Sequence, residues 1–261
     1  MNHPVDLAAH GLATTVTLSF IMWVASVVRR DASLVDRVWS VFIAAASVAY
    51  AFGLGDISPR GMVMLALVVT WSVRLSVYIT RRNWGHGEDR RYREIRDRNQ
   101  PHFALKSLYL IFGLQALLAS IISAPVFAGL LGTARWTWLD STGAAVTLFG
   151  IAFEAIADAQ MSRFKANPGH AGQVMDKGLW RYTRHPNYFG EACVWWGLWL
   201  MALAGGGLGS LTSVISPMLM TLLLVRVSGV SLLEKDIAER RPAYVAYISR
   251  TNAFLPGPPK A

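Results

Sequence analysis

The sequence predicts an all-α polytopic membrane protein with seven transmembrane helices, and three observations support this fold class. Of its 261 residues, 53% are hydrophobic and only 16% are charged, whereas a soluble domain of this size usually has about 25% charged residues. Apolar stretches long enough to cross a bilayer recur along the chain. Basic residues concentrate in alternate connections between these stretches. We therefore expect one membrane-embedded domain.

The predicted spans are apolar stretches bounded by polar or turn residues, and they fall near residues 11–28, 38–56, 61–80, 105–131, 142–160, 189–209 and 211–230. The first follows ten residues that contain neither a basic segment nor a cleavage site, so we expect it to be retained as a span. The only cysteine, Cys193, lies in the sixth span. An intramolecular disulfide and a cysteine-based metal site are therefore excluded, and the scattered histidines indicate no other metal site.

Basic residues also predict the orientation of the chain. The connections after spans one, three and five, and the C-terminal tail, hold most of the lysines and arginines, whereas the opposite side holds only Arg60 and Arg135. By the positive-inside rule, the N-terminus lies outside and the C-terminus lies in the cytoplasm. The net charge of +9 is then mainly a consequence of topology, and we expect no nucleic-acid partner.

The most informative segment is residues 178–191, GLWRYTRHPNYFGE, which runs directly into the tryptophan-rich sixth span. Polar groups at the mouth of a membrane helix are costly unless they bind something polar. Arg181 and Arg184, with the backbone N–H groups of a helix that starts near Pro186, form a ready anion site. Positive-inside charge explains either arginine alone. It explains less well the density of polar neighbours, which are Tyr182, His185, Asn187, Tyr188 and Glu191.

Two acidic residues lie inside the fifth span. Glu154 and Asp158 are four residues apart and therefore share one helix face. Ionisable residues within a span are functional candidates by default. The alternative for Glu154 is a buried pair with Arg74 of span three that fixes helix packing. Asp158 lies nearer the cytoplasmic end, where a ligand can reach it, so a functional role is favoured there.

Tyr78 and Arg81 are three residues apart at the cytoplasmic end of the third span, so both can face one cavity. A tyrosine hydroxyl in a membrane cavity can polarise a carbonyl group by donating a hydrogen bond. The competing interpretation is a tyrosine of the interfacial aromatic belt.

Several motifs together resemble a known family. The strip 178–191, the preceding DAQMSRFKANPG at 158–169, the tail from LLEK to FLP, and DRVWS at 36–40 resemble bacterial membrane proteins of the DUF1295 group, in the steroid 5α-reductase superfamily. The resemblance implies a seven-helix enzyme of the bacterial inner membrane that opens to the cytoplasm. It also implies NADPH as the cofactor, with a hydride passed to the β-carbon of a lipophilic, steroid-like or other enone substrate.

The resemblance assigns site residues position by position. It implies cofactor contacts at Arg81, Asp158, Lys165, Asn187, Glu191 and Tyr244, to which the strip adds Arg181, Tyr182, Arg184, His185 and Tyr188. Tyr78 and Glu154 are the catalytic candidates. Residues 1–104 would form the substrate side, and residues 105–261 the cofactor-binding helices, loop and tail. Span two lacks the Gln-Glu pair that holds the ketone in steroid reductases, so the resemblance does not select a steroid.

Two alternatives remain open. An S-adenosylmethionine-dependent methyltransferase of the isoprenylcysteine type shares the RHPxY part of the strip, and a non-catalytic lipid-binding membrane protein would also carry apolar spans. The longer NYFGE match and the basic cluster favour the dinucleotide, and the acids within spans argue against a non-catalytic role. The partners expected are therefore membrane lipid and a lipophilic substrate.

Overall fold

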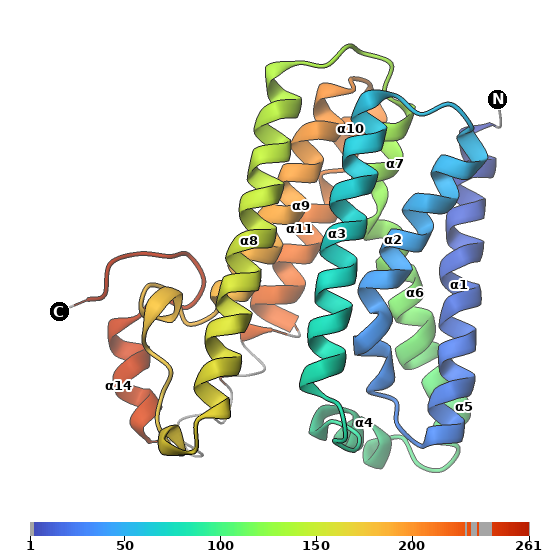
Figure 1. Cartoon of the computed structure of the whole chain (residues 1–261). Helices are drawn as coiled ribbons and strands as arrows, with labels where there is room; N and C mark the ends of the chain where they lie inside the picture. The colour runs from blue at the N-terminus through green and yellow to red at the C-terminus, as the bar shows by residue number, and fades with distance from the viewer. Residues whose placement is uncertain (1–2, 228, 231–233, 235–241, 261) are drawn as a thin grey trace. The chain divides into compact units, whose positions relative to one another are not determined.

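The computed structural model describes residues 3–227, 229–230, 234 and 242–260, and every regular element within these ranges is helical (Figure 1). The predicted all-α class is confirmed for this part of the chain. The chain divides into two compact units. The first unit comprises Met1–Asp140 and Met201–Ser213, and the second comprises Ser141–Leu200 and Val214–Ala261.

Six helical segments among the described residues are long and apolar enough to cross a membrane. They are α1 (Pro4–Arg29), α2 (Leu34–Leu54), α3 (Pro59–Arg82), the segment Phe103–Leu131, α8 (Trp138–Ala166) and the segment Leu208–Val227. The remaining predicted span, residues 189–209, falls largely on the 19-residue helix α9 (Pro186–Ala204), which is not among the six. Its first turns carry Asn187 and Glu191, and polar residues lower the mean hydropathy of a helix.

Two of the six segments are interrupted helices. Phe103–Leu131 consists of α5 (Phe103–Ser107), the π-helical η1 (Leu108–Gly113), α6 (Leu114–Ile122) and α7 (Ala124–Leu131). Leu208–Val227 consists of α10 (Leu208–Thr212), α11 (Ile215–Leu222) and the π-helical η4 (Leu223–Val227). The helix is interrupted just before α7, next to Pro125. Proline has no backbone N–H, so it cannot donate the hydrogen bond that would continue the preceding helix. The other short helices are α4 (Arg90–Arg98), η2 (Pro168–His170), η3 (Gly178–Arg181) and α14 (Ala243–Arg250).

In the first unit, α2 packs against both α1 and α3 (Figure 1). Buried hydroxyl groups link these helices to their neighbours. Ser19 donates to the carbonyl of Phe112 over 2.6 Å, and the hydroxyls of Tyr50 and Ser123 lie 2.9 Å apart. Lipid provides little hydrophobic drive between helices, so such hydrogen bonds and close packing hold membrane helices together.

The charged connection after α3 folds onto the ends of α1 and α2. Glu88 accepts the backbone N–H of Ala32 over 2.7 Å and pairs with Arg96 at 2.7 Å. Although burial raises the pKa of Glu88, its hydrogen bond with Arg96 and the other cationic contacts lower the pKa below its ordinary value. Arg91 of α4 reaches Asp36 of α2 at 2.9 Å. The charges of this segment therefore pair both within the segment and with α2.

Arg60, at the start of α3, is the centre of a buried ion pair in the first unit. Its Nε lies 2.5 Å from Oδ1 of Asp140 and its Nη2 lies 2.9 Å from Oδ2. Three backbone carbonyls, of Ala134, Arg135 and Ala204, accept its remaining hydrogen bonds at 3.1 Å each. Arg60 is only 2% exposed and Asp140 is fully buried. The guanidinium group thus joins α3, the connection before α8 and the end of α9 within one unit.

We expect Arg60→Ala to lower the free energy of unfolding by about 3–5 kcal/mol, because it leaves the Asp140 carboxylate buried without its cation. Arg135→Ala is the matched control, since the exposed Arg135 contributes its backbone carbonyl, which alanine retains. Thermal unfolding of the detergent-purified variants measures the stability of each. Equal stability of the two variants would contradict the structural role of the pair.

In the second unit, glycines allow α8 and α9 to approach closely. A Cβ atom built on Gly150 would lie 2.6 Å from the carbonyl oxygen of Gly190, and one built on Gly190 would lie 2.7 Å from the backbone nitrogen of Glu154. Small residues at such contacts let membrane helices pack backbone to backbone. The contact fixes Glu154 beside the first turns of α9, and the rings of Phe153 and Phe189 pack edge to face next to it.

Gly190→Ala should destabilise the protein by about 1–3 kcal/mol, because the added methyl group meets backbone atoms that cannot move independently. Gly209→Ala in α10 is the control, since its Cβ would meet nothing within 4 Å. The midpoints of thermal unfolding of the two variants test this difference. A loss that is the same in both would mean that the close contact does not limit the packing of α8 and α9.

Candidate functional site

The polar strip 178–191 is held against α8 by two hydrogen bonds. Leu179 donates its backbone N–H to Oε1 of Gln160 over 3.0 Å. The indole of Trp180 donates to the carbonyl of Ala157 over 3.0 Å, and this tryptophan is buried. The apolar ring of Trp180 thus anchors η3, and the strip continues from there into α9.

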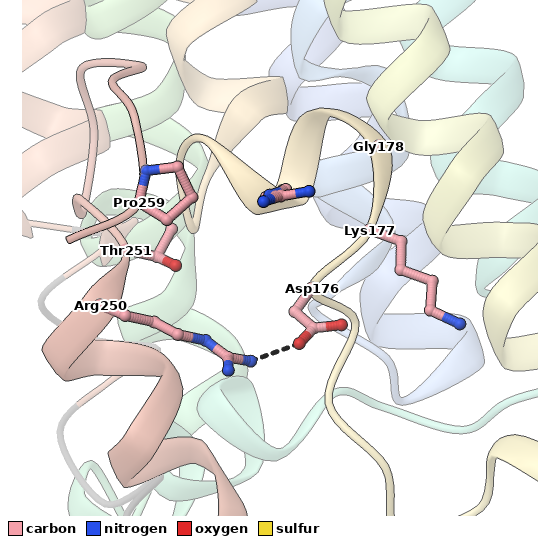
Figure 2. Close-up of a pocket in the computed structure, with 7 residues that line it drawn as sticks. Asp176, Lys177, Gly178, Arg250, Thr251 and Pro259 are labelled. Carbon is pink, nitrogen blue, oxygen red and sulfur yellow. Dashed lines mark hydrogen bonds and ion pairs between the residues drawn. The ribbon is translucent and has the colours of Figure 1, made fainter. Parts of the chain in front are cut away.

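A cleft with a volume of about 360 Å³ opens beside the first residues of the strip. Figure 2 shows residues from both of its walls, which are Asp176, Lys177, Gly178, Arg181, Arg250, Thr251 and Pro259. Three of these residues are cations and one is an acid. Arg250 of α14 forms an ion pair with Asp176 across the cleft. Among the three cations, the sequence predicts a site role only for Arg181, which belongs to the strip.

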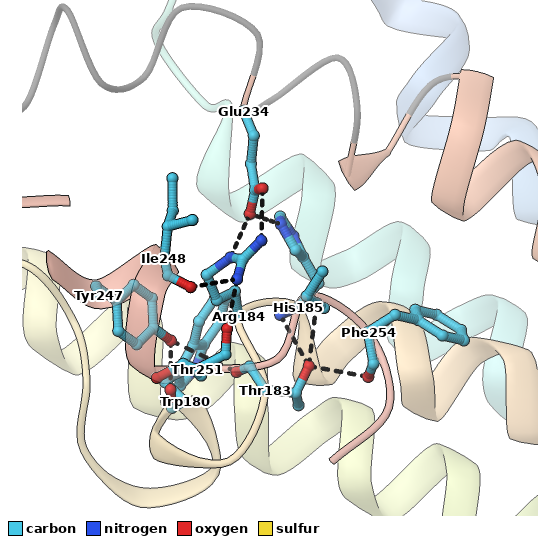
Figure 3. Close-up of polar contacts among 10 residues, drawn as sticks. Trp180, Thr183, Arg184, His185, Glu234, Tyr247, Ile248, Thr251 and Phe254 are labelled. Carbon is cyan, nitrogen blue, oxygen red and sulfur yellow. Dashed lines mark hydrogen bonds and ion pairs between the residues drawn. The ribbon is translucent and has the colours of Figure 1, made fainter. Parts of the chain in front are cut away.

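Arg184 lies within a dense polar network (Figure 3). Its Nε and Nη2 bind the two carboxylate oxygens of Glu234 at 2.7 and 2.8 Å. Its Nη1 donates to the carbonyls of Ile248 and Thr251. Nε2 of His185 lies 2.9 Å from the same carboxylate. Arg184 therefore uses the two-pronged geometry that arginine offers to a carboxylate, and it binds the tail of its own chain.

Backbone contacts extend this attachment along the tail. Arg184 N–H donates to the carbonyl of Asn252 over 2.9 Å, and Gly257 N–H donates to the carbonyl of Tyr182 over 3.0 Å. The hydroxyl of Tyr247 donates to the carbonyl of Trp180. The segment from α14 to Lys260 is consequently fixed against the strip, and each wall of the cleft supports the other.

Glu234 and Tyr247 are site residues that our reading of the sequence missed as partners of the strip. The signal available was the LLEK segment, which places an acid directly after two leucines at the start of the tail. Burial raises the pKa of Glu234, but hydrogen bonds from His185 and Arg184 and the charge of Arg184 outweigh it and lower this pKa to about 2. The carboxylate is therefore ionised wherever the fold is intact near neutral pH.

The predicted acids of the second unit are buried. Glu154 is 2% exposed, Asp158 is 3% exposed and Glu191 is 7% exposed. Glu154 and Asp158 lie on the inward face of α8, as their spacing predicts. Because carboxyl groups within membrane helices are expensive to keep there, this face is a candidate for ligand contact.

The other predicted residues differ in exposure. Asn187, Tyr188 and Tyr244 are half-buried, and the rings of His185 and Tyr188 stack with centroids 5.3 Å apart. Four residues are exposed, namely Arg81, Lys165, Arg181 and Tyr182. Tyr78 is half-buried in α3 and, like Arg81, belongs to the first unit. The second unit thus brings together the strip, the tail and the acids of α8, and the roles assigned to these residues stay predictions.

We expect Glu234→Gln to lower the free energy of unfolding by about 1–3 kcal/mol at neutral pH, because neutral glutamine leaves the Arg184 charge without its counterion. The wild-type carboxylate has a pKa below its ordinary value of 4.5, so its contribution is complete above that pH and declines as pH falls towards 2. Unfolding measured from pH 7 to pH 2 should show the two proteins converging in acid. A difference that persists unchanged at pH 2 would contradict this assignment.

Comparison with known proteins identifies the family of this chain. The family model described as a protein of unknown function (DUF1295) matches residues 22–251. An uncharacterized protein of Schizosaccharomyces pombe is 28% identical over 279 residues, which cover 94% of this chain and 78% of that protein. No solved structure gives a significant match. Because the matched range includes the polar strip, the helices that hold it and most of the tail, the chain belongs to the DUF1295 family.

Proposed function

We propose that this protein is an NADPH-dependent reductase, related to the steroid 5α-reductase superfamily, that reduces a conjugated carbon–carbon double bond of a lipophilic substrate. One observation carries the proposal: the second unit combines the buried acids of α8 and α9 with a cationic cleft beside the strip. A dinucleotide phosphate needs both features, since acids bind ribose hydroxyls and cations bind phosphates.

When bound, NADPH would supply a hydride for the β-carbon of the enone, and the α-carbon would then need a proton. Asp158, Asn187 and Glu191 are proposed to bind and orient the polar parts of the cofactor. Tyr78 is proposed to donate a hydrogen bond to the substrate carbonyl, where negative charge develops during hydride addition. Glu154 is proposed to hold the proton delivered to the α-carbon.

The membrane arrangement that goes with this function is part of the proposal. α9 would act as a seventh span beside the six apolar segments, with the N-terminus outside and the C-terminus in the cytoplasm of a bacterial inner membrane. The distribution of basic residues supports this orientation. The strip and its cleft would then open to the cytoplasm, where NADPH is available, and the substrate would enter from the bilayer.

We expect NADPH to raise the melting temperature of the detergent-purified protein, because a ligand at a hundredfold excess over its dissociation constant stabilises the folded state by about 2.7 kcal/mol. Asp158→Asn and Glu191→Gln should each weaken NADPH binding about tenfold, since each removes one charge-assisted hydrogen bond. Ser162→Ala, an exposed change on α8, is the control. Oxidation of NADPH with a panel of lipophilic enones then tests the reaction.

The outcomes separate the proposed function from its alternatives. Unchanged NADPH affinity in both acid variants would contradict the proposed cofactor site. Stabilisation by S-adenosylmethionine and not by NADPH would indicate the methyltransferase. A folded sample that binds neither ligand would favour a non-catalytic, lipid-binding role.

A further inference from the structure

We propose that the cleft between the loop at 176–181 and the end of α14 is a binding site for a phosphate-bearing compound, held by Lys177, Arg181 and Arg250. The three cations share a cavity of about 360 Å³ with one carboxylate, that of Asp176. This volume lies within the range of about 300–1,000 Å³ that is typical of small-molecule sites. The excess of positive charge favours an anion that carries at least two negative charges.

The two walls of the cleft are fixed before a ligand arrives. The loop wall is continuous with η3, which Trp180 anchors to α8. The opposite wall is tied down by the backbone bonds from Gly257 to Tyr182 and from Lys260 to the carbonyl of Arg250, at 3.0 and 2.8 Å. A site whose walls are already ordered loses less entropy when it binds, so its cations bind an anion more effectively.

The carboxylate of Asp176 forms an ion pair with the guanidinium group of Arg250. Figure 2 shows the carboxylate directed at the guanidinium group, with Asp176 between Arg250 and Lys177 in this view. Both partners are accessible to water, since 47% of the Arg250 side chain and 34% of the Asp176 side chain are exposed. Water screens such a pair, so little stability is lost when it opens. A phosphate matches the planar fork of arginine and carries more charge than one carboxylate.

A purely structural explanation accounts for fewer of the charged residues in the cleft than anion binding does. In that explanation the Asp176–Arg250 pair only fastens α14 to the loop. Backbone bonds and the Arg184–Glu234 pair already fasten these segments together. The structural explanation also leaves Lys177 and Arg181 without a role in the cavity, and the positive-inside rule would have to account for them separately. Binding of an anion accounts for all three cations together.

The chemistry recognised is a phosphate group, and it has two potential sources. One is the phosphates of the dinucleotide proposed above, and the other is a free phosphorylated metabolite. The inference does not rest on the reductase activity, because inorganic pyrophosphate alone probes the cleft. NADPH competition then distinguishes the sources: displacement of pyrophosphate by NADPH assigns the cleft to the dinucleotide, and simultaneous binding assigns it to a separate phosphorylated ligand.

The test is calorimetric titration of the detergent-purified full chain with inorganic pyrophosphate at low ionic strength, because salt screens exposed charges. Lys177→Ala and Arg181→Ala should each weaken binding about tenfold. Asp176→Asn should strengthen it roughly two- to fivefold, because it frees Arg250 from its internal competitor. Arg29→Ala, an exposed change of equal charge in the first unit, should leave the affinity unchanged.

The sign of the Asp176→Asn effect is the sharpest part of this test. A structural fastening predicts weaker or unchanged binding in that variant, whereas a competitor predicts tighter binding. Melting temperatures close to that of the wild type show that each variant is folded. Absence of pyrophosphate binding in the wild type, or an equal loss in Arg29→Ala and Arg181→Ala, would overturn the proposal.

Discussion

The second unit depends on the two-pronged pair between Arg184, which is buried, and Glu234, which is half-buried. The two residues are 50 positions apart, and their contact brings the tail to the strip that precedes α9. The same guanidinium group also binds two carbonyls at the end of α14. The hydrogen bond from Tyr247 to Trp180 and the backbone bond from Gly257 to Tyr182 hold the tail against the strip as well. A buried charge must be paired to be tolerated, so the pair also allows few other positions for the tail.

Arginine plays a comparable role in the first unit. Arg60 and Asp140 are 80 positions apart, and their buried pair joins segments that hydrophobic packing alone would leave free to slide. In the sequence, Arg60 is one of two basic residues on the side with few charges, and Arg184 is a candidate ligand for an anion. The positive-inside rule describes on which side of the membrane a charge lies, and it carries no information about whether that charge faces water or the protein interior.

The two proposals for the second unit share the cationic cleft, but the reductase also needs a second physical feature. The reductase depends on acids buried in a helix pair whose close contact is permitted by Gly150 and Gly190. The phosphate site depends on cations that remain accessible at a cleft with fixed walls. The buried acids and the accessible cations could bind the two ends of one polar ligand. Each group could equally bind a ligand of its own.

The sequence by itself determined the helical class, the apolar segments long enough to cross a membrane, and the helix face shared by Glu154 and Asp158. These properties follow from hydropathy, spacing and charge within a few residues, which local sequence contains. Tertiary structure alone decided that Glu234 pairs with Arg184, that Asp140 pairs with Arg60, and that Lys177 and Arg250 share a cleft with Arg181. A chain with 25 basic and 16 acidic residues permits many pairings, and only the packing of distant helices selects among them.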